Sequence, residues 1–294
     1  MTNLKYIFSI FFSAFFLTVF SQTLKCDSVV LYLEGYQGGT IQWQSSADGT
    51  TWTDVSGEDT VNITVPYSNT LTYRAVVIDG SCDPVISSPI SNFTPPAFTQ
   101  PEIDTINNGD ENTFMRVMNI YLQPDSAILR SVSLPIMPCD TTTLTHLMNR
   151  MYKTVRNPAH PGVGIAAPQV GINRRAFWIQ RYDKLPANNP PFEFYINPRI
   201  IAHSDTTFLD PDGCLSVPTG SGYPVLVTKT YRWIWVLVEY NLIDGTFICE
   251  KIVHPYTSHI FQHEYDHLDG TMYFDHSGSK NLRIVVHGYT ETVK

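Results

Sequence analysis

Residues 262–270 read QHEYDHLDG, with two histidines four positions apart and a glutamate directly after the first. In a helix, His263 and His267 would lie one turn apart on the same face, with about 5–6 Å between their Cβ atoms. Two imidazoles at this spacing can bind one metal ion, and Glu264 can then reach a water molecule beside it. The stretch therefore predicts an HExxH helix that carries a metal site. The alternative is a pair of half-buried structural histidines beside a solvated glutamate.

Catalytic zinc and iron sites usually have three protein ligands, so two histidines need a further donor. Residues 210–218 read DPDGCLSVP and contain the best candidate, Cys214. The glycine before it, Gly213, lets the backbone turn tightly and approach a ligand closely. A structural thiol or a disulfide partner is the alternative role for this cysteine. The candidates after His267 stand in less suggestive contexts: Asp269, Asp275, His276, His287 and Glu291.

Length and composition indicate a folded, globular chain around this helix. The chain has 294 residues, of which 43% are hydrophobic and 13% aromatic, and this is enough for two domains with apolar cores. The net charge of −8 leaves no basic excess to neutralise phosphates, so nucleic acid is not expected as a partner.

The first 20 residues have the pattern of a secretory signal peptide. Lys5 is followed by the apolar run IFSIFFSAFFLTVF and then by polar SQT, which predicts a signal peptide over residues 1–22. A membrane anchor is the alternative, but the run is shorter than the ~20 residues that a spanning helix needs. We therefore expect an exported protein, periplasmic or secreted, without stable membrane insertion once the signal is removed.

Residues 23–92 consist of short alternating runs separated by turn signals, which predicts a small all-β sandwich. The stretches GTIQWQSSADGTTWTDVSG (39–57) and TYRAVV (72–77) resemble the immunoglobulin-like modules of secreted bacterial proteins. That resemblance implies a spacer or binding module, and the sequence does not identify its partner. Residues 93–112 are rich in proline and asparagine and lack a hydrophobic period, so they are expected to form a linker.

Residues 113–294 are expected to form one α+β domain. Apolar residues follow the threonines at 141–143 at helical spacing and predict a core helix: Leu144, Leu147, Met148, Met151, Tyr152 and Val155. Strand-like runs come next, among them AFWIQ (176–180), FEFYINP (192–198) and IWVLVEYNLIDG (234–245). Strands that surround a few helices, with the HExxH helix at the centre, indicate the α+β class.

Three segments of this domain resemble, in order, the signature motifs of the peptide deformylases. They read PGVGIAAPQVG (161–171), DGCLSVP (212–218) and QHEYDHLDG (262–270). The resemblance implies a hydrolase that removes the formyl group from N-formylmethionyl peptides and releases formate. It also implies one divalent metal ion, Fe²⁺ in the family, with Zn²⁺ or Ni²⁺ as other candidates. Carried over by motif position, it assigns the site residues: Cys214, His263 and His267 as metal ligands, Glu264 as general acid and base, and Gln169 with the backbone N–H of Leu215 as oxyanion donors.

A substrate pocket is expected beside this centre. Side chains at Gly162 and Gly164 would block an extended peptide from pairing with this backbone edge. Tyr256 and Ile260 precede His263 by seven and three residues, which places them on the same face of the helix. With Val163 they would line an apolar slot, and such a slot suits the methionine side chain of deformylase substrates.

One departure from the family concerns the residue before Gly213. The family has a glutamate where this chain has Asp212, and Arg232 aligns with a family arginine by its distance from Gly245. If that arginine pairs with the glutamate, the shorter aspartate is expected to reach it less well. We therefore expect reduced but not abolished activity.

Export is a second departure, because deformylation acts on chains that emerge from ribosomes. A thiolate that holds Fe²⁺ is vulnerable to oxidation outside the cytoplasm, where Zn²⁺ survives better. The five cysteines fit such a compartment if Cys26 pairs with Cys82 and Cys139 with Cys249, because Cys214 then remains for the metal.

Two alternatives to an active deformylase stay open. The domain could bind a metal without turnover as part of a secreted binding module, which Asp212 and the added sandwich favour. It could also be an HExxH metallopeptidase, although Gln169 and Cys214 argue against that interpretation.

Overall fold

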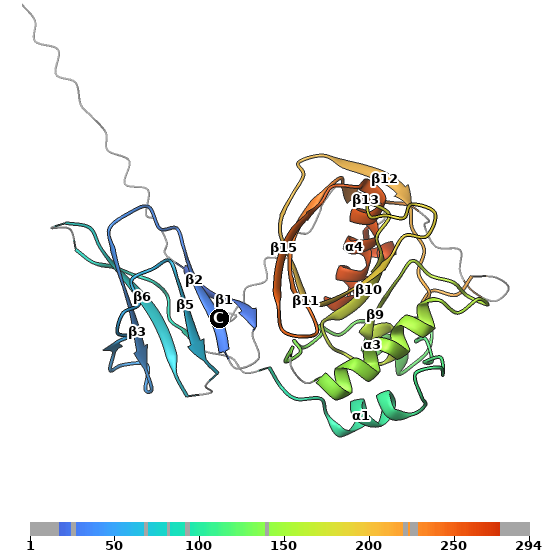
Figure 1. The fold of residues 1–294 in the computed structure, drawn as a ribbon, viewed down its shortest axis with the longest axis horizontal. Coiled ribbons are helices and arrows are strands. Elements are labelled where there is room, and N and C mark those ends of the chain that lie inside the picture. The colour runs from blue at the N-terminus through green and yellow to red at the C-terminus, as the bar shows by residue number, and fades with distance from the viewer. Residues whose placement is uncertain are drawn as a thin grey trace, which may run out of the picture. The chain divides into compact units, whose positions relative to one another are not determined.

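The structure is a computed structural model that describes residues 18–24, 28–67, 70–80, 83–91, 95–138, 141–219, 223 and 229–276. The chain divides into two compact units, Met1–Thr94 and Pro95–Lys294 (Figure 1). Residues 1–17 of the predicted signal peptide lie outside the described residues. Its last five residues belong to strand β1 (Thr18–Leu24), which pairs antiparallel with β2 (Ser28–Glu34). No helix within the described ranges is both long and apolar enough to cross a membrane.

The first unit is all-β in its described residues and contains two antiparallel sheets. One sheet has the strand order β1-β2-β5, and the other has the order β4-β3-β6-β7, with β8 also paired to β6. The remaining strands are β3 (Thr40–Ser46), β4 (Thr53–Asp54), β5 (Asn62–Pro66), β6 (Thr72–Ile78), β7 (Val85–Ile86) and β8 (Ile90–Ser91).

The two sheets share one hydrophobic core. Alternate residues of β2, β3, β5 and β6 point into it, as the period of two in a strand requires. Trp43 is fully buried there, and its indole N–H donates to the carbonyl of Thr60 at 2.8 Å. The predicted disulfide between Cys26 and Cys82 lies outside the described residues.

The second unit is built on a five-stranded antiparallel sheet with the order β15-β14-β11-β10-β9. A separate hairpin, β12 with β13, precedes β14 in the chain. The strands are β9 (Gly164–Ala166), β10 (Ala176–Gln180), β11 (Phe192–His203), β12 (Thr207–Pro211), β13 (Lys229–Trp233), β14 (Val236–Asn241) and β15 (Phe247–Ile252). Short helical turns complete the unit: α2 (Asp125–Leu129), η1 (Ala167–Val170) and η2 (Tyr273–His276).

The two faces of this sheet hold different helices, as the alternation along β10 and β11 dictates. On one face, the rings of Phe177 and Tyr195 contact Phe261 of α4 (Pro255–Leu268), with centroids 5.0 and 5.2 Å apart. On the other face, the indole of Trp178 donates to the carbonyl of Met148 in α3 (Thr141–Val155) at 2.9 Å. Figure 1 shows α4 inside the curve of the sheet. The prediction of a mixed α and β unit is confirmed, and the predicted core helix is α3.

Local sequence explains where α4 begins. Pro255 occupies the first helical position, where its fixed φ fits and its missing N–H is not needed. The side chain of His254 caps the helix, because its Nδ1 accepts the backbone N–H of Thr257 at 3.4 Å. The helix carries His263, Glu264 and His267 in its last three turns, all of them buried.

The expectation of a linker over residues 93–112 is corrected. Residues 100–107 form helix α1 (Gln100–Asn107), whose first turn is held by the backbone N–H of Thr99 donating to Glu102 at 2.7 Å. Ile106 is fully buried in the core of the second unit, and Glu102 pairs with the buried Arg174 at 2.7 Å. The segment therefore belongs to the second unit.

The predicted Cys139–Cys249 disulfide is also wrong. Cys249 is an exposed free thiol on β15, on the same side of the strand as the exposed Lys251 and opposite the buried Ile252. Cys139 lies outside the described residues. Cys214 is the other free cysteine in the part of the chain that the structure describes.

Candidate metal centre

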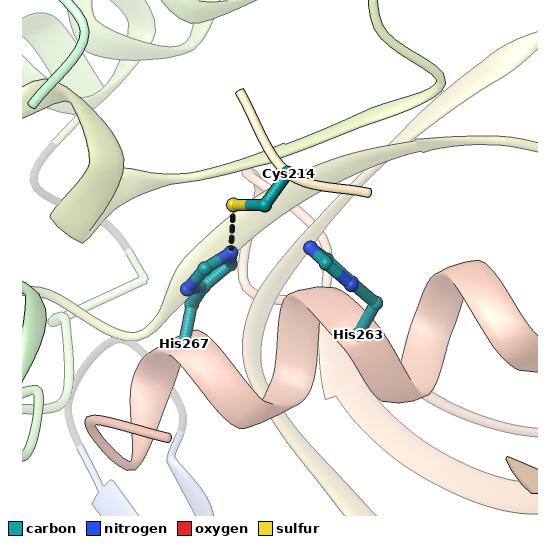
Figure 2. A group of neighbouring side chains, drawn as sticks. All are labelled: Cys214, His263 and His267. Atoms are coloured by element: carbon teal, nitrogen blue, oxygen red, sulfur yellow. Dashed lines mark hydrogen bonds between the residues drawn. The ribbon is translucent and has the colours of Figure 1, made fainter. Parts of the chain in front are cut away.

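The structure brings together the three predicted metal ligands, which come from two separate segments. Cys214 lies in the turn after β12, whereas His263 and His267 extend from one side of α4 (Figure 2). One donor atom from each of the three lies within 4.8 Å of the others. Cys214 Sγ is 3.3 Å from His267 Nε2. They form the one group of three potential ligands found among the described residues.

Hydrogen bonding fixes the orientation of the first histidine. Its Nδ1 lies 2.6 Å from Asp212 Oδ1. Because a carboxylate can only accept, Nδ1–H of His263 is the donor, and Nε2 is left to face the cluster. A carboxylate behind a ligating histidine is the usual way in which proteins orient such a ring.

The donor set fits a divalent transition metal. One thiolate and two imidazoles are the ligand types of zinc and iron sites, and a set of three leaves a position open for water or substrate. Ligands at usual Zn–S and Zn–N distances would be about 3.5 Å apart in a tetrahedral site, close to the 3.3 Å between Cys214 and His267. Burial lowers the pKa of His267 to about 3, so its imidazole is neutral, as a ligand must be.

Glu264 is placed as a buried acid beside these ligands. Only 4% of the residue is exposed, and burial raises the pKa of its carboxyl to about 8, although the charge of His263 opposes this shift. Its Oε2 has no hydrogen-bond partner among the described residues. A carboxyl with such a pKa and a free oxygen can exchange a proton with a reacting group near neutral pH.

Gln169 lies beside the cluster, in η1. Its Oε1 accepts the backbone N–H of Ala166 at 2.8 Å, which turns the amide nitrogen toward the centre. That nitrogen is 3.3 Å from Cys214 Sγ and 3.4 Å from the hydroxyl of Ser216. The amide is therefore a donor held at the edge of the site. Leu215 follows directly after Cys214 and lines the same pocket.

A pocket of about 340 Å³ opens beside the metal centre. Its lining contains Cys214, His263, Glu264 and Gln169. It also contains every residue that the sequence assigned to substrate binding: Gly162, Val163, Gly164, Tyr256 and Ile260. The ring of Tyr256 packs edge-on against Tyr182, with 4.9 Å between the centroids. The pocket walls thus come from β9, η1, the Cys214 turn and α4.

A buried network lies behind the ligands, and sequence reasoning found only part of it. Asp212 bonds to Arg232 at 3.1 Å, and Arg232 also pairs with Asp266 of the HExxH helix. Asp212 has two further partners, Thr230 and His259, that the sequence did not suggest. Burial raises the pKa of Asp212, but the charges of His263 and Arg232 and the hydrogen bond from His259 lower it more, so it stays well below the usual range.

The expected loss of reach at Asp212 is not found. Its carboxylate contacts both His263, at 2.6 Å, and Arg232, at 3.1 Å. The turn after β12 brings the backbone of residue 212 close enough for the shorter side chain. Two sequence patterns relate to the missed partners: Thr230 lies on the same face of β13 as Arg232, and His259 lies one helical turn before His263.

An α+β unit in which a thiolate, two imidazoles and a buried carboxyl surround an open pocket has the features of a metal-dependent hydrolase. A family model described as polypeptide deformylase matches residues 117–283. A second model, a domain of unknown function (DUF8696), matches residues 21–92.

Curated relatives carry the same family name. A peptide deformylase of Thermotoga neapolitana is 34% identical over 148 residues, which cover 50% of this chain and 80% of the relative. One from Shouchella clausii is 33% identical over 175 residues, covering 55% and 90%. A Met-Ala-Ser-bound crystal structure of class I type b peptide deformylase from Acinetobacter baumannii is 28% identical, covers 56% of this chain and 99% of that one, and superposes with a TM-score of 0.47.

The chain belongs to the peptide deformylase family. Its members are metal-dependent enzymes that remove the N-formyl group from nascent peptides. The family match lies within the second unit, and the first unit lies outside it.

Proposed function

We propose that the unit Pro95–Lys294 removes the formyl group from N-formylmethionyl peptides and releases formate, with Cys214, His263 and His267 as the ligands of one divalent metal ion. The observation that carries this proposal is the convergence of the three donor atoms within 4.8 Å, beside the buried carboxyl of Glu264. Family membership supports the same reaction.

Glu264 moves the proton in this reaction. It accepts a proton from the attacking water, whose hydroxyl adds to the formyl carbon. When the C–N bond breaks, Glu264 returns this proton to the amine nitrogen, and formate and the unblocked peptide leave. Burial favours the protonated form of this carboxyl, which lets Glu264 hold the proton between the two steps. A divalent ion at the three ligands supplies Lewis-acid chemistry, lowering the pKa of the attacking water and withdrawing charge from the formyl oxygen.

Gln169 and the backbone N–H of Leu215 donate to the formyl oxygen as negative charge develops on it. The amide of Gln169 is pre-oriented by its bond to Ala166, so little reorganisation is needed during the reaction. The methionine side chain of the substrate fits the slot lined by Val163, Tyr256 and Ile260. Gly162 and Gly164 leave the backbone edge open to the peptide.

The site acts outside the cytoplasm in this proposal. The apolar run at residues 7–20 supports export, and cleavage after residue 22 would remove most of β1 and leave β2 at the edge of its sheet. Zn²⁺ suits such a compartment better than Fe²⁺, because a thiolate that holds iron is open to oxidation. The mass of the protein isolated from the medium or periplasm tests the cleavage site.

The first unit is proposed to be an immunoglobulin-like spacer. Two antiparallel sheets around one core with a buried tryptophan support this interpretation. Its partner, if it binds one, is not identified by any residue cluster in the described strands.

Formate release tests the activity directly. Purified full-length chain is loaded in separate samples with Zn²⁺, Ni²⁺ or, without oxygen, Fe²⁺, and is given formyl-Met-Ala-Ser. We expect formate release with at least one metal and none from metal-free protein. Full metal loading without formate under any condition would favour the alternative of a metal-binding module without turnover. Cleavage of the unformylated peptide would favour a metallopeptidase.

A further inference from the structure

Four donors converge on the Asp212 carboxylate, which is 3% exposed. Oδ1 accepts from His263 Nδ1 at 2.6 Å. Oδ2 accepts from the Thr230 hydroxyl at 2.7 Å and from Arg232 at 3.1 Å, and it faces His259 Nε2 at 3.3 Å. The carboxylate therefore has donors on both oxygens, and three of the four share one oxygen.

These donors come from two elements that the carboxylate joins. Thr230 and Arg232 lie two residues apart on the buried face of β13, and they are 1% and 3% exposed. His259 and His263 lie one turn apart on α4, and they are 3% and 7% exposed. Asp212 itself follows β12 and stands two residues before Cys214. The hydrogen bonds to this carboxylate therefore fix the turn that carries Cys214 relative to the helix that carries His263.

Arg232 alone holds Asp212 incompletely, because the same guanidinium also pairs with Asp266. Thr230 and His259 do not divide their donors between two carboxylates of the site, because each directs its donor at Oδ2 of Asp212. With Oδ2 fixed by these two groups, rotation of the carboxylate is restricted, and Oδ1 is kept on the line of His263 Nδ1–H. When a metal ion takes the place of the proton on Nε2, His263 keeps its Nδ1–H on Asp212 and directs the Nε2 lone pair at the cluster.

We propose that Thr230 and His259 are positioning residues for the metal ligand His263 and act through Asp212. Their two donors compensate for an aspartate at this position by anchoring its short side chain from the side opposite to His263. The proposal rests on the proposed metal site, and it adds two residues that neither touch the metal nor the reacting atoms.

Metal retention is the readout, because activity alone would not separate positioning from substrate contacts at His259. The full-length chain is loaded with Co²⁺, and loss of its visible absorption to excess chelator gives the release rate. Removal of a group that orients a ligand typically weakens metal binding by about 10- to 100-fold. We therefore expect Thr230→Val and His259→Leu to release Co²⁺ about 10-fold faster than wild type.

Conservative variants separate the hydrogen bond from the packing. Thr230→Ser keeps the hydroxyl, and His259→Gln keeps a side-chain N–H, so both are expected to release Co²⁺ within about twofold of wild type. Thr154→Val is the matched control: Thr154 is 3% exposed, and its hydroxyl donates to the Arg150 carbonyl at 2.7 Å, far from the ligands in sequence. It should lower stability without changing release.

A double-mutant cycle tests that Asp212 is the link. Asp212→Glu adds a methylene and moves the carboxylate relative to Thr230. In that background Thr230→Val should accelerate Co²⁺ release by less than about twofold, because the moved carboxylate no longer accepts the Thr230 hydroxyl in the same geometry. An equal effect in both backgrounds would overturn the proposed route through Asp212.

The other possible results of these measurements also test the proposal. Wild-type release rates in both Thr230→Val and His259→Leu overturn the proposal, as does equally fast release in Thr154→Val. If Thr230→Val does not fold, the release rates of His259→Leu and His259→Gln test the proposal. Formate release by the same wild-type sample separates this proposal from the function: a chain that retains Co²⁺ but forms no formate contradicts the activity alone, and a chain that binds no Co²⁺ contradicts both.

Discussion

Gly164 of β9 lies directly against the carboxyl of Glu264 in α4. A Cβ atom added at this glycine would be 2.8 Å from both Cγ and Cδ of Glu264, closer than side chains pack. Position 164 of the motif PGVGIAAPQVG therefore needs a glycine for two reasons: a side chain there would clash with Glu264, and it would block access by a peptide. β9 and α4 can approach this closely because residue 164 has no side chain.

Replacing Gly164 with alanine should displace Glu264 without touching a metal ligand. A shift of about 1 Å in a reacting group can cost about 100-fold in rate, so we expect kcat to fall by one to two orders of magnitude, about 10- to 100-fold. Metal content should stay at the wild-type level. Steady-state kinetics on a formylated tripeptide, together with metal analysis, measures both. Unchanged kcat would mean that Glu264 has room to move.

Glu264→Gln should abolish most activity while the metal remains bound. The amide keeps the size of the side chain but cannot accept or return a proton, and a general acid and base typically contributes about 10²- to 10⁴-fold. We therefore expect kcat/KM to fall within that range. Formate release and metal content of the same preparation are the measurements. A loss of metal in parallel would show instead that Glu264 helps to hold the ion.

The same variant should change how stability depends on pH in metal-free protein. The pKa of Glu264 is about 8 when folded and 4.5 for the free group, so the folded state holds the proton more tightly. Stability from this group is complete below the unfolded pKa and is lost as the pH rises through the folded pKa. At about pH 8.5, Glu264→Gln should exceed wild type in free energy of unfolding by on the order of a few kcal/mol.

Urea unfolding of both metal-free proteins at about pH 8.5 and about pH 4.5 tests this sign. The difference between them should shrink at the lower pH, where wild-type Glu264 is protonated in the folded state and about half protonated in the unfolded state. A constant difference at both values would contradict the raised pKa.

Gln169→Ala should lower kcat more than it raises KM. The amide is expected to donate to the formyl oxygen mainly when charge develops there, and loss of one such donor typically costs about 10²- to 10³-fold in kcat. Gln180 serves as a control, since its amide donates to the carbonyl of Pro190 at 3.0 Å on β10. Gln180→Ala should leave both constants near wild type. An equal rise of KM and no change of kcat in Gln169→Ala would indicate ordinary substrate binding.

Local spacing explains what the sequence could predict about the site. His263 and His267 share a helical face by their separation alone, and Cys214 follows from the need for a third donor and from the family resemblance. Tyr256 and Ile260 follow from the same helical period. These relationships are fixed within one element or one motif, so a pattern in the sequence is sufficient to find them.

Long-range contacts explain what it could not predict. Helix α1 looked like a linker because its burial depends on Arg174, which lies 72 residues after Glu102. Thr230 lies 18 positions after Asp212 and reaches it only because β13 pairs with β12. The spacing of Thr230 and Arg232, or of His259 and His263, indicates a shared face of a strand or helix but not that Asp212 is the partner, because that contact depends on the tertiary fold.

Cys214→Ser should remove the metal as well as the activity. A serine hydroxyl stays protonated near neutral pH and is a poor ligand for Zn²⁺ or Fe²⁺, whereas a thiolate binds either strongly. Because a direct ligand is lost, the metal affinity should fall by more than the roughly 10- to 100-fold that loss of an orienting partner costs. Metal analysis after gel filtration, with formate release, measures this. Cys249→Ser is the matched control, because Cys249 is the exposed free thiol on β15 and lies outside the donor cluster. Full metal content in Cys214→Ser, or its loss in Cys249→Ser, would contradict the assignment of Cys214 as the third ligand.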